Sequence, residues 1–234
     1  MSHRFFVEED VGDQIVIDGD RAHQIANVLR LKPGDEITLV RNGVEALVLL
    51  DGVDADKVRG RCVSKRPVDA EPRVRLTLAL PILRGDRTEE VVEAVTQLGV
   101  SAIVPFVSAR SVVRSLPDAK RGRWTRVARE AAETARRGRV PTIDSPREWS
   151  RLFDALEAPV LVAWESEVLV KLQDAVPDTR RLSLVIGPEG GLSMEEIALA
   201  REHHAVTVSL GPRNLRSETA AIAAVAQAMA ILER

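Results

Sequence analysis

The residues with the clearest chemical potential lie in two tight turns near the C-terminal end of the chain. The first turn is GPEGG at residues 187–191, directly after a short apolar strand. The second is GPRN at residues 211–214, after another apolar run, and it leads to Arg216 and Glu218. Glycine lets backbone N–H and C=O groups approach a ligand without an intervening side chain. Two such turns predict a small-ligand site at the carboxyl edge of a sheet, with a cation and a carboxylate beside it.

Helices must follow both turns to hold these residues in place. Ser193 is the expected N-cap of the first helix, because Glu196 follows at the capping-box spacing. The second helix begins at Glu218. A strand followed by GPEGG and a helix is also compatible with an ordinary connection, but the second turn with its charged pair favours a ligand site.

The two turns resemble signature segments of the RsmE family, which are uridine-N3 methyltransferases of 16S rRNA within the SPOUT superfamily. In that family GPEGG and LG-x-x-x-LR-x-ET bind S-adenosylmethionine, and this chain has GPEGG and LGPRNLRSET. The resemblance implies that S-adenosylmethionine is the cofactor. The expected cofactor-binding residues are Leu80, Ile186, Gly187, Gly190, Leu210, Gly211, Asn214 and Leu215.

The resemblance also implies a reaction, the transfer of a methyl group to N3 of a uridine in 16S rRNA within the small ribosomal subunit. This reaction requires loss of the N3 proton. Arg216 could stabilise the negative charge that develops on the uracil oxygens, and Glu218 could accept the proton or orient Arg216. The alternative for this pair is a helix-capping carboxylate with a neighbouring salt bridge.

Composition is that of an ordinary globular protein. The 234 residues are 45% hydrophobic and 29% charged, which is typical of soluble domains. The single cysteine, Cys62, excludes an internal disulfide, and the four histidines show no metal-binding spacing. The N-terminus lacks the apolar region of a signal peptide, and no apolar run is long enough to span a membrane. We therefore expect a cytoplasmic protein without a metal.

Positive charge is concentrated in one part of the chain. The net charge is −2, but residues 73–140 hold 14 Lys and Arg against 7 Asp and Glu. Clustered cations favour phosphate contacts, and aromatic residues, at 3%, are too few for a base-stacking platform. Folded rRNA is therefore the expected partner.

The expected RNA-binding residues come from this region and from the N-terminal part. Arg136, Arg137 and Arg139 follow a basic helix and have no carboxylate four residues further on, unlike Arg126 with Glu130 and Arg129 with Glu133. Solvated surface is the alternative for these arginines and for the helix positions His23 and Arg30. The full set is Arg4, His23, Arg30, Arg84, Arg110, Arg129, Arg136, Arg137 and Arg139.

The pattern of elements predicts an α/β protein with two domains. Residues 1–70 read as short strands with an Asn42-Gly43 hairpin and one helix over 21–31, capped by Asp20. Their segments HRFF and HQIANVLRLKPGD resemble the PUA-like β-barrel of the family, which helps to hold RNA. Residues 73–234 alternate strands and helices, which predicts a mostly parallel sheet covered on both faces. The strands are expected at 74–80, 102–107, 160–164, 182–186 and 206–210, and the helices at 87–98, 122–137, 168–174, 194–204 and 218–232.

No G-x-G-x-x-G follows the first strand of the second domain, which argues against a dinucleotide-binding Rossmann fold. The resemblance implies instead the SPOUT arrangement with a C-terminal trefoil knot. The last helix is apolar on all sides, so it should be buried all round, and we expect a homodimer. Three positions depart from the family pattern, Arg84 for Lys, Gln97 for Glu and Thr134 for Gln. Two other functions remain open, a SPOUT enzyme for another RNA position and a non-catalytic RNA-binding ribosome assembly factor.

Overall fold

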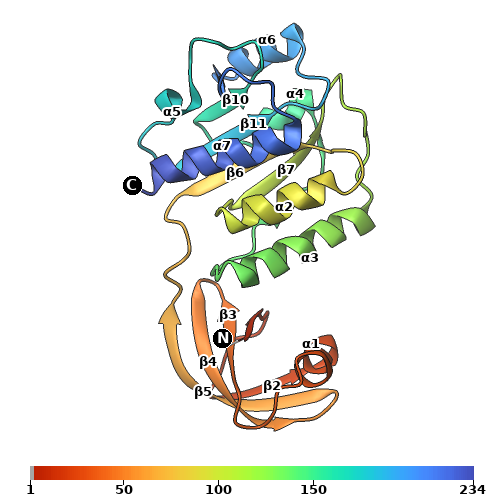
Figure 1. Cartoon of the computed structure of the whole chain (residues 1–234), viewed down its shortest axis with the longest axis vertical. Helices are drawn as coiled ribbons and strands as arrows, with labels where there is room; N and C mark the ends of the chain where they lie inside the picture. Colours follow the sequence, from red (N-terminus) through yellow and green to blue (C-terminus); the bar gives the residue numbers. More distant parts are fainter. Residues whose placement is uncertain (1–2) are drawn as a thin grey trace. The chain divides into compact units, whose positions relative to one another are not determined.

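The chain divides into two compact units. The structure, a computed structural model, describes residues 3–234 (Figure 1). The first unit comprises the described residues up to Glu71 together with Ala132–Arg139. The second unit comprises Pro72–Ala131 and Val140–Arg234. The segment Ala132–Arg139 therefore clusters with residues that lie far from it in the sequence.

The first unit is built on a curled five-stranded sheet with the order β1-β3-β4-β5-β2 (Figure 1). β1 is parallel to β3, and the other neighbours are antiparallel. The strands are β1 (His3–Phe6), β2 (Gln14–Asp18), β3 (Glu36–Arg41), β4 (Val44–Val53) and β5 (Lys57–Pro67). Asn42 and Gly43 join β3 to β4 with φ of 49° and 81°. The predicted hairpin is confirmed, with the positive φ values that a type I′ turn needs.

The helical segment of this unit differs from the prediction of one α-helix over 21–31 with Asp20 as its N-cap. A short helix, α1 (Gly19–His23), runs directly into a π-helix, η1 (Gln24–Val28). Asp18 occupies the N-cap position and makes no side-chain capping hydrogen bond. Asp20 was therefore wrong as the N-cap, since it lies inside the first turn, and the second half of the segment has π rather than α turns.

The second unit contains a seven-stranded sheet in which every pairing is parallel. The strand order is β12-β10-β11-β6-β7-β8, and β9 also pairs with β7. All five predicted strands are present, and the two-residue strands β8 and β9 were not predicted. The strands are β6 (Arg75–Pro81), β7 (Ala102–Val107), β8 (Thr142–Ile143), β9 (Arg147–Glu148), β10 (Val160–Ala163), β11 (Arg181–Ile186) and β12 (Val206–Val208).

Helices cover both faces of this sheet, as predicted (Figure 1). One face is covered by α2 (Arg87–Gln97), α3 (Asp118–Thr134), α5 (Leu172–Ala175) and α7 (Ser217–Leu232), and the other by α4 (Trp149–Leu152), η2 (Phe153–Ala155) and α6 (Met194–Glu202). Successive strand side chains point to opposite faces. In β11, Leu182 and Leu184 accordingly pack into the first core, and Val185 packs into the second.

Helix α7 is buried along one stripe rather than all round. Its buried residues are Ser217, Ala220, Ala221, Ala224, Val225, Ala228 and Met229. Ile222 and Ile231 are half-buried, and Ala230 is exposed. Within one chain α2, α5 and the sheet contact only part of the helix, so burial on its other side, which was expected from a second subunit, stays a prediction.

Within residues 3–234, none of the helices combines the length and hydropathy that a membrane span requires.

Candidate active site

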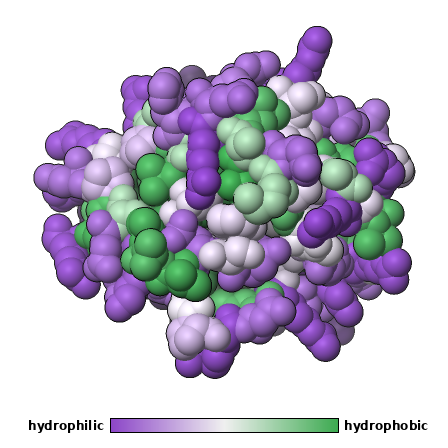
Figure 2. All heavy atoms as spheres, turned by 90° about the horizontal axis from the view of Figure 1, so that it is seen from above, coloured by the Kyte–Doolittle hydropathy of each residue, from purple (hydrophilic) through white to green (hydrophobic). Residues whose placement is uncertain are grey.

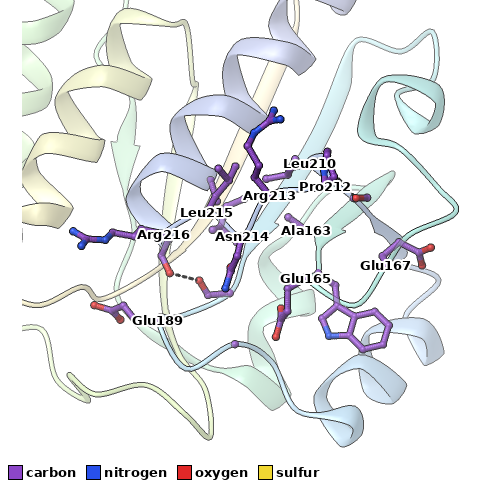
Figure 3. Close-up of a pocket in the computed structure, with 18 of the residues that line it drawn as sticks. Ala163, Glu165, Glu167, Glu189, Leu210, Pro212, Arg213, Asn214, Leu215 and Arg216 are labelled. Atoms are coloured by element: carbon purple, nitrogen blue, oxygen red, sulfur yellow. Dashed lines mark hydrogen bonds between the residues drawn. The ribbon is translucent and has the colours of Figure 1, made fainter.

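A pocket of about 930 Å³ opens where three neighbouring parallel strands end (Figure 3). It is lined by segments that directly follow β10, β11 and β12, and by Ala220 of α7. These segments contribute residues 163–165, Glu167, Val168 and Lys171, residues 186–191 and residues 209–217. The carboxyl edge of a parallel sheet is the usual ligand site in open α/β folds, and the volume suits a small organic ligand.

The first glycine turn forms one wall of the pocket, and close packing explains its glycines. A Cβ on Gly191, whose φ is +71°, would lie 2.3 Å from Oε1 of Glu165. A Cβ on Gly190 would lie 3.0 Å from the Cβ of Arg110. The Arg110 guanidinium donates a hydrogen bond to the Gly190 carbonyl (3.1 Å). The turn is therefore held between side chains that follow two other strands.

The turn is also tied to α7. The hydroxyl of Ser217 donates a hydrogen bond of 2.8 Å to the carbonyl of Gly187 (Figure 3). Ser217 is the first residue of α7, so this bond fixes the start of the helix against the glycine turn. The two predicted turns thus meet at one edge of the sheet.

Helix α6, which follows the glycine turn, has the predicted capping box. Ser193 Oγ accepts from the backbone N–H of Glu196 (3.2 Å), and Glu196 Oε2 accepts from the backbone N–H of Ser193 (2.9 Å). The other carboxylate oxygen of Glu196 accepts from the backbone N–H of Ala109 (2.8 Å). Glu196 therefore connects the start of α6 to the segment after β7.

Replacing Ser193 with alanine should lower the free energy of unfolding by about 1 kcal/mol, because the backbone N–H of Glu196 loses the Ser193 hydroxyl that accepts its hydrogen bond. Urea unfolding of the variant measures this change. Ser150→Ala, an exposed serine of α4, is the control. Equal stability of the two variants would show that the cap contributes nothing measurable.

The second turn presents its residues to the same pocket. Gly211 has a φ of +116°, a conformation that favours glycine. Of the expected cofactor-binding residues, seven line the pocket: Ile186, Gly187, Gly190, Leu210, Gly211, Asn214 and Leu215. Leu80 does not. It is only 1% exposed within the core on the α7 side of the sheet, so its assignment to the pocket wall was wrong, because the side chain points into the helix-covered face.

Glu189 and two carboxylates that follow the end of β10, Glu165 and Glu167, line the pocket but were not predicted as site residues (Figure 3). Glu167 accepts hydrogen bonds from the Thr207 hydroxyl (2.7 Å) and from the backbone N–H of Leu169 (3.0 Å). These bonds, the Thr207 bond first, lower the pKa of Glu167. The available signal was their position after a predicted strand that lies beside the other two.

The predicted charged pair is arranged differently from the expectation. Arg216 is exposed and lines the pocket, but Glu218 does not line it. Oε1 of Glu218 lies 3.9 Å from Nε of Arg87, and Nη1 of Arg87 lies 3.8 Å from Oε1 of Glu189. Glu218 was expected to accept the proton or to orient Arg216, and these roles stay predictions. The first residue of α2 is its cationic neighbour, and no sequence motif indicated this.

Arg137 is buried, against the prediction that it lacks a partner and contacts phosphate. Its side chain is 2% exposed and pairs with Glu71 at 2.8 Å. Glu71 also accepts from the backbone N–H groups of Gly138 (2.9 Å) and Arg139 (3.2 Å). Arg137 is thus a structural residue of the first unit, since a buried guanidinium needs a carboxylate partner.

Arg4 is likewise engaged within the first unit. It pairs with Glu45 and donates to the carbonyl of Arg137 (3.0 Å), and its side chain is only 10% exposed. Partial burial raises the pKa of Glu45, but hydrogen bonds from Arg4 and Arg66 outweigh this effect and lower it overall. These partners leave Arg4 poorly placed for the predicted RNA contact.

The other expected RNA-binding residues lie at the surface. In the first unit, His23, Arg30, Arg136 and Arg139 are exposed. In the second unit, Arg84 and Arg110 are exposed and Arg129 is half-buried. Glu133, expected beside Arg129, accepts from the backbone N–H of Phe6 (3.1 Å) and from Arg21 (3.3 Å).

Hydrophobic side chains also reach the surface between hydrophilic ones (Figure 2). In the second unit the most exposed are Val168 and Leu169, at 76% and 85%. Val168 belongs to the pocket lining, and both follow Glu167 in the loop that Glu167 orders. This loop therefore presents apolar surface beside the pocket.

Comparisons with known proteins show that the chain is similar to RNA methyltransferases. A family model described as "RNA methyltransferase domain" matches residues 70–229, more than half of the chain. The chain is 34% identical over 223 residues to ribosomal RNA small subunit methyltransferase E of Bacillus subtilis, covering 89% of this chain and 87% of that protein. It is 33% identical over 235 residues to the protein of the same name from Mycobacterium tuberculosis, covering 94% and 88%.

Solved structures give the same result. Ribosomal RNA small subunit methyltransferase E of Neisseria gonorrhoeae, solved with S-adenosylmethionine, matches with a TM-score of 0.88 and 28% identity, covering 97% of this chain and 96% of that one. A Legionella pneumophila protein, also solved with S-adenosylmethionine, matches with a TM-score of 0.88 and 28% identity over 98% of both chains. The chain belongs to the ribosomal RNA small subunit methyltransferase E family.

Proposed function

We propose that this protein transfers a methyl group from S-adenosylmethionine to N3 of a uridine in 16S rRNA, within the small ribosomal subunit. The observation that carries the proposal is the pocket of about 930 Å³ at the carboxyl ends of β10, β11 and β12, with both glycine turns in its wall. Family membership and the S-adenosylmethionine-bound relatives support it.

The pocket residues suit S-adenosylmethionine in shape and charge. The two glycine turns offer backbone groups for the adenine and ribose, and Ile186 and Leu215 supply apolar surface. Glu165 and Glu167 place carboxylates in the lining, which complement the positive sulfonium and ammonium groups of this molecule. When bound, S-adenosylmethionine supplies the electrophilic methyl group.

The protein's own part in the reaction is to position uracil and manage its charge. Arg216, exposed at the pocket, stabilises the negative charge that develops on the uracil oxygens. Glu218 accepts the N3 proton. Its Oε2 is buried and, within residues 3–234, has no hydrogen-bond partner. A buried carboxylate oxygen without a donor is unusual, and a proton-accepting role accounts for it.

RNA binding rests on the exposed cations of each unit. His23, Arg30, Arg136 and Arg139 of the first unit, and Arg84, Arg110 and Arg129 of the second, contact rRNA phosphates in this proposal. The curled sheet of the first unit then acts as a PUA-like RNA-binding domain. Recognition by phosphate contacts and RNA shape agrees with the scarcity of aromatic residues.

We also propose a homodimer and a C-terminal trefoil knot for the second unit. The half-buried apolar side of α7 and the exposed Val168 and Leu169 supply surface for a second copy of the chain. The bond between Ser217 and Gly187 holds the end of the chain against the earlier turn, as a knotted arrangement requires. Light scattering should give twice the 25.6 kDa mass of the chain, and a monomeric mass would contradict the dimer.

Calorimetry with S-adenosylmethionine tests the pocket assignment. We expect one molecule bound per chain, and at 100 times its Kd a stabilisation of about 2.7 kcal/mol in thermal unfolding. ATP, which shares the adenosine but carries a negative triphosphate, should not bind. Absence of S-adenosylmethionine binding, or equal binding of ATP, would contradict the proposal.

A further inference from the structure

Arg87 stands where three separate segments of the second unit meet. It is the first residue of α2, and its side chain is 43% exposed. Its guanidinium lies 3.8 Å from Glu189, in the glycine turn, and 3.9 Å from Glu218, in the first turn of α7. One cation therefore lies near two carboxylates from different segments, and both are about 100 residues or more further along the sequence.

Interactions within α2 do not explain why an arginine occupies its first position. The N-terminal end of a helix carries partial positive charge, so a cation at the first position is unfavourable. Glu89 and Glu90 are the acidic residues of that first turn, but the carboxylates near the Arg87 guanidinium are Glu189 and Glu218. The favourable interactions of Arg87 thus lie across the pocket edge, outside α2.

The distances leave hydrogen-bonding capacity unused. Both exceed the usual N–H···O range of 2.7–3.2 Å, so Arg87 attracts the carboxylates without occupying their lone pairs. Oε2 of Glu218 is buried without a hydrogen-bond partner in the described part of the chain. Glu189 lines the pocket, and its side chain and that of Arg216 extend to the same side of it, away from Glu167 (Figure 3).

We propose that Arg87 is a positioning residue for the methyl transfer. It holds the carboxylate of Glu189 in the pocket lining and that of Glu218 beside the pocket. At these distances it leaves the Glu218 carboxylate, which is 16% exposed, able to accept the N3 proton. The inference rests on the proposed function, since it assigns Arg87 to the same reaction. It predicts that loss of Arg87 lowers turnover while binding of both substrates is retained.

The test compares Arg87→Ala and Arg87→Lys with the parent protein on small ribosomal subunits that lack the modification. For Arg87→Ala we expect kcat to fall about 100-fold, the lower end of a general acid–base contribution. The KM for subunits and the Kd for S-adenosylmethionine should change less than about threefold, because Arg87 binds neither in this account. Arg87→Lys keeps the positive charge but lacks the planar guanidinium, and its kcat should be about tenfold higher than that of Arg87→Ala.

Arg181→Ala is the matched control. Arg181 forms a similarly long ion pair, 3.6 Å from Glu157, and is 61% exposed at the start of β11, the opposite end from the pocket. The kcat of Arg181→Ala should equal that of the parent protein. Melting temperatures of all variants distinguish a folding defect from a catalytic defect. If Arg87→Ala does not fold, the kcat of Arg87→Lys is compared with that of the parent instead.

A double-mutant cycle with Glu218→Gln measures the coupling. If Arg87 acts through Glu218, the double variant loses little more kcat than Glu218→Gln alone. The inference is overturned if Arg87→Ala keeps kcat within twofold, if its loss lies in KM, if lysine restores nothing, or if the two losses multiply. An inactive parent protein would instead refute the proposed function itself.

Discussion

Replacing Arg216 with alanine should reduce kcat for methylation of small ribosomal subunits by about 10²–10³-fold. This is the usual loss when a single donor to a developing negative charge is removed. Arg216 is exposed, lines the pocket and precedes α7, whose first residue is fixed to the glycine turn by the bond between Ser217 and Gly187. The backbone next to Arg216 is therefore held in place by this hydrogen bond.

The measurement is initial-rate methylation with labelled S-adenosylmethionine, accompanied by calorimetry of S-adenosylmethionine binding. The Kd should stay within about threefold of the parent value, because the cofactor-binding groups are the backbone of the glycine turns. Arg151→Ala, an exposed arginine of α4, should retain full activity. If Arg216→Ala keeps the parent kcat, or loses activity only through weaker S-adenosylmethionine binding, the assigned role of Arg216 is wrong.

Replacing Arg137 with alanine should destabilise the first unit by about 3–5 kcal/mol, the usual result of removing one partner of a buried ion pair. Arg137 is 2% exposed, and its loss leaves the Glu71 carboxylate without the 2.8 Å guanidinium contact. The same side chain lies where Ala132–Arg139 clusters with the N-terminal residues. Urea unfolding, followed by circular dichroism, measures the change.

Arg139→Ala is the control for this prediction. Arg139 is exposed, and the hydrogen bond that it donates to Glu71 comes from its backbone N–H, which alanine retains. Its stability should change by less than about 0.5 kcal/mol, while affinity for rRNA decreases. An Arg137→Ala variant as stable as the parent, with weaker RNA binding, would restore the original assignment of Arg137 to phosphate contact.

Local sequence signals correctly predicted most of the strands, turns and helix starts of the fold. Ser193 and Glu196 form the expected capping box, and the turn at Asn42-Gly43 has the expected positive φ values. The five main strands of the second unit lie where the apolar runs predicted them. Each of these signals depends on residues within a few positions of one another, so the sequence alone determines them.

Contacts between distant segments were not predictable in this way. Arg137 and Glu71 are 66 residues apart, and nothing near Arg137 in the sequence indicates a carboxylate partner. Arg87 lies near Glu189 because β6 and β11 are neighbours in the sheet, and near Glu218 because α2 packs against α7. Leu80 was expected in the cofactor site together with Ile186 and Leu215, but its side chain packs into the core on the α7 side of the sheet.

The most direct test of the account uses small ribosomal subunits from a strain that lacks this protein. The subunits are incubated with the protein and labelled S-adenosylmethionine, and the rRNA is digested to nucleosides for mass spectrometry. We predict a single 3-methyluridine in 16S rRNA, formed about 10²–10³-fold more slowly with Arg216→Ala. Label in another nucleoside, or no label despite binding of S-adenosylmethionine, would contradict it.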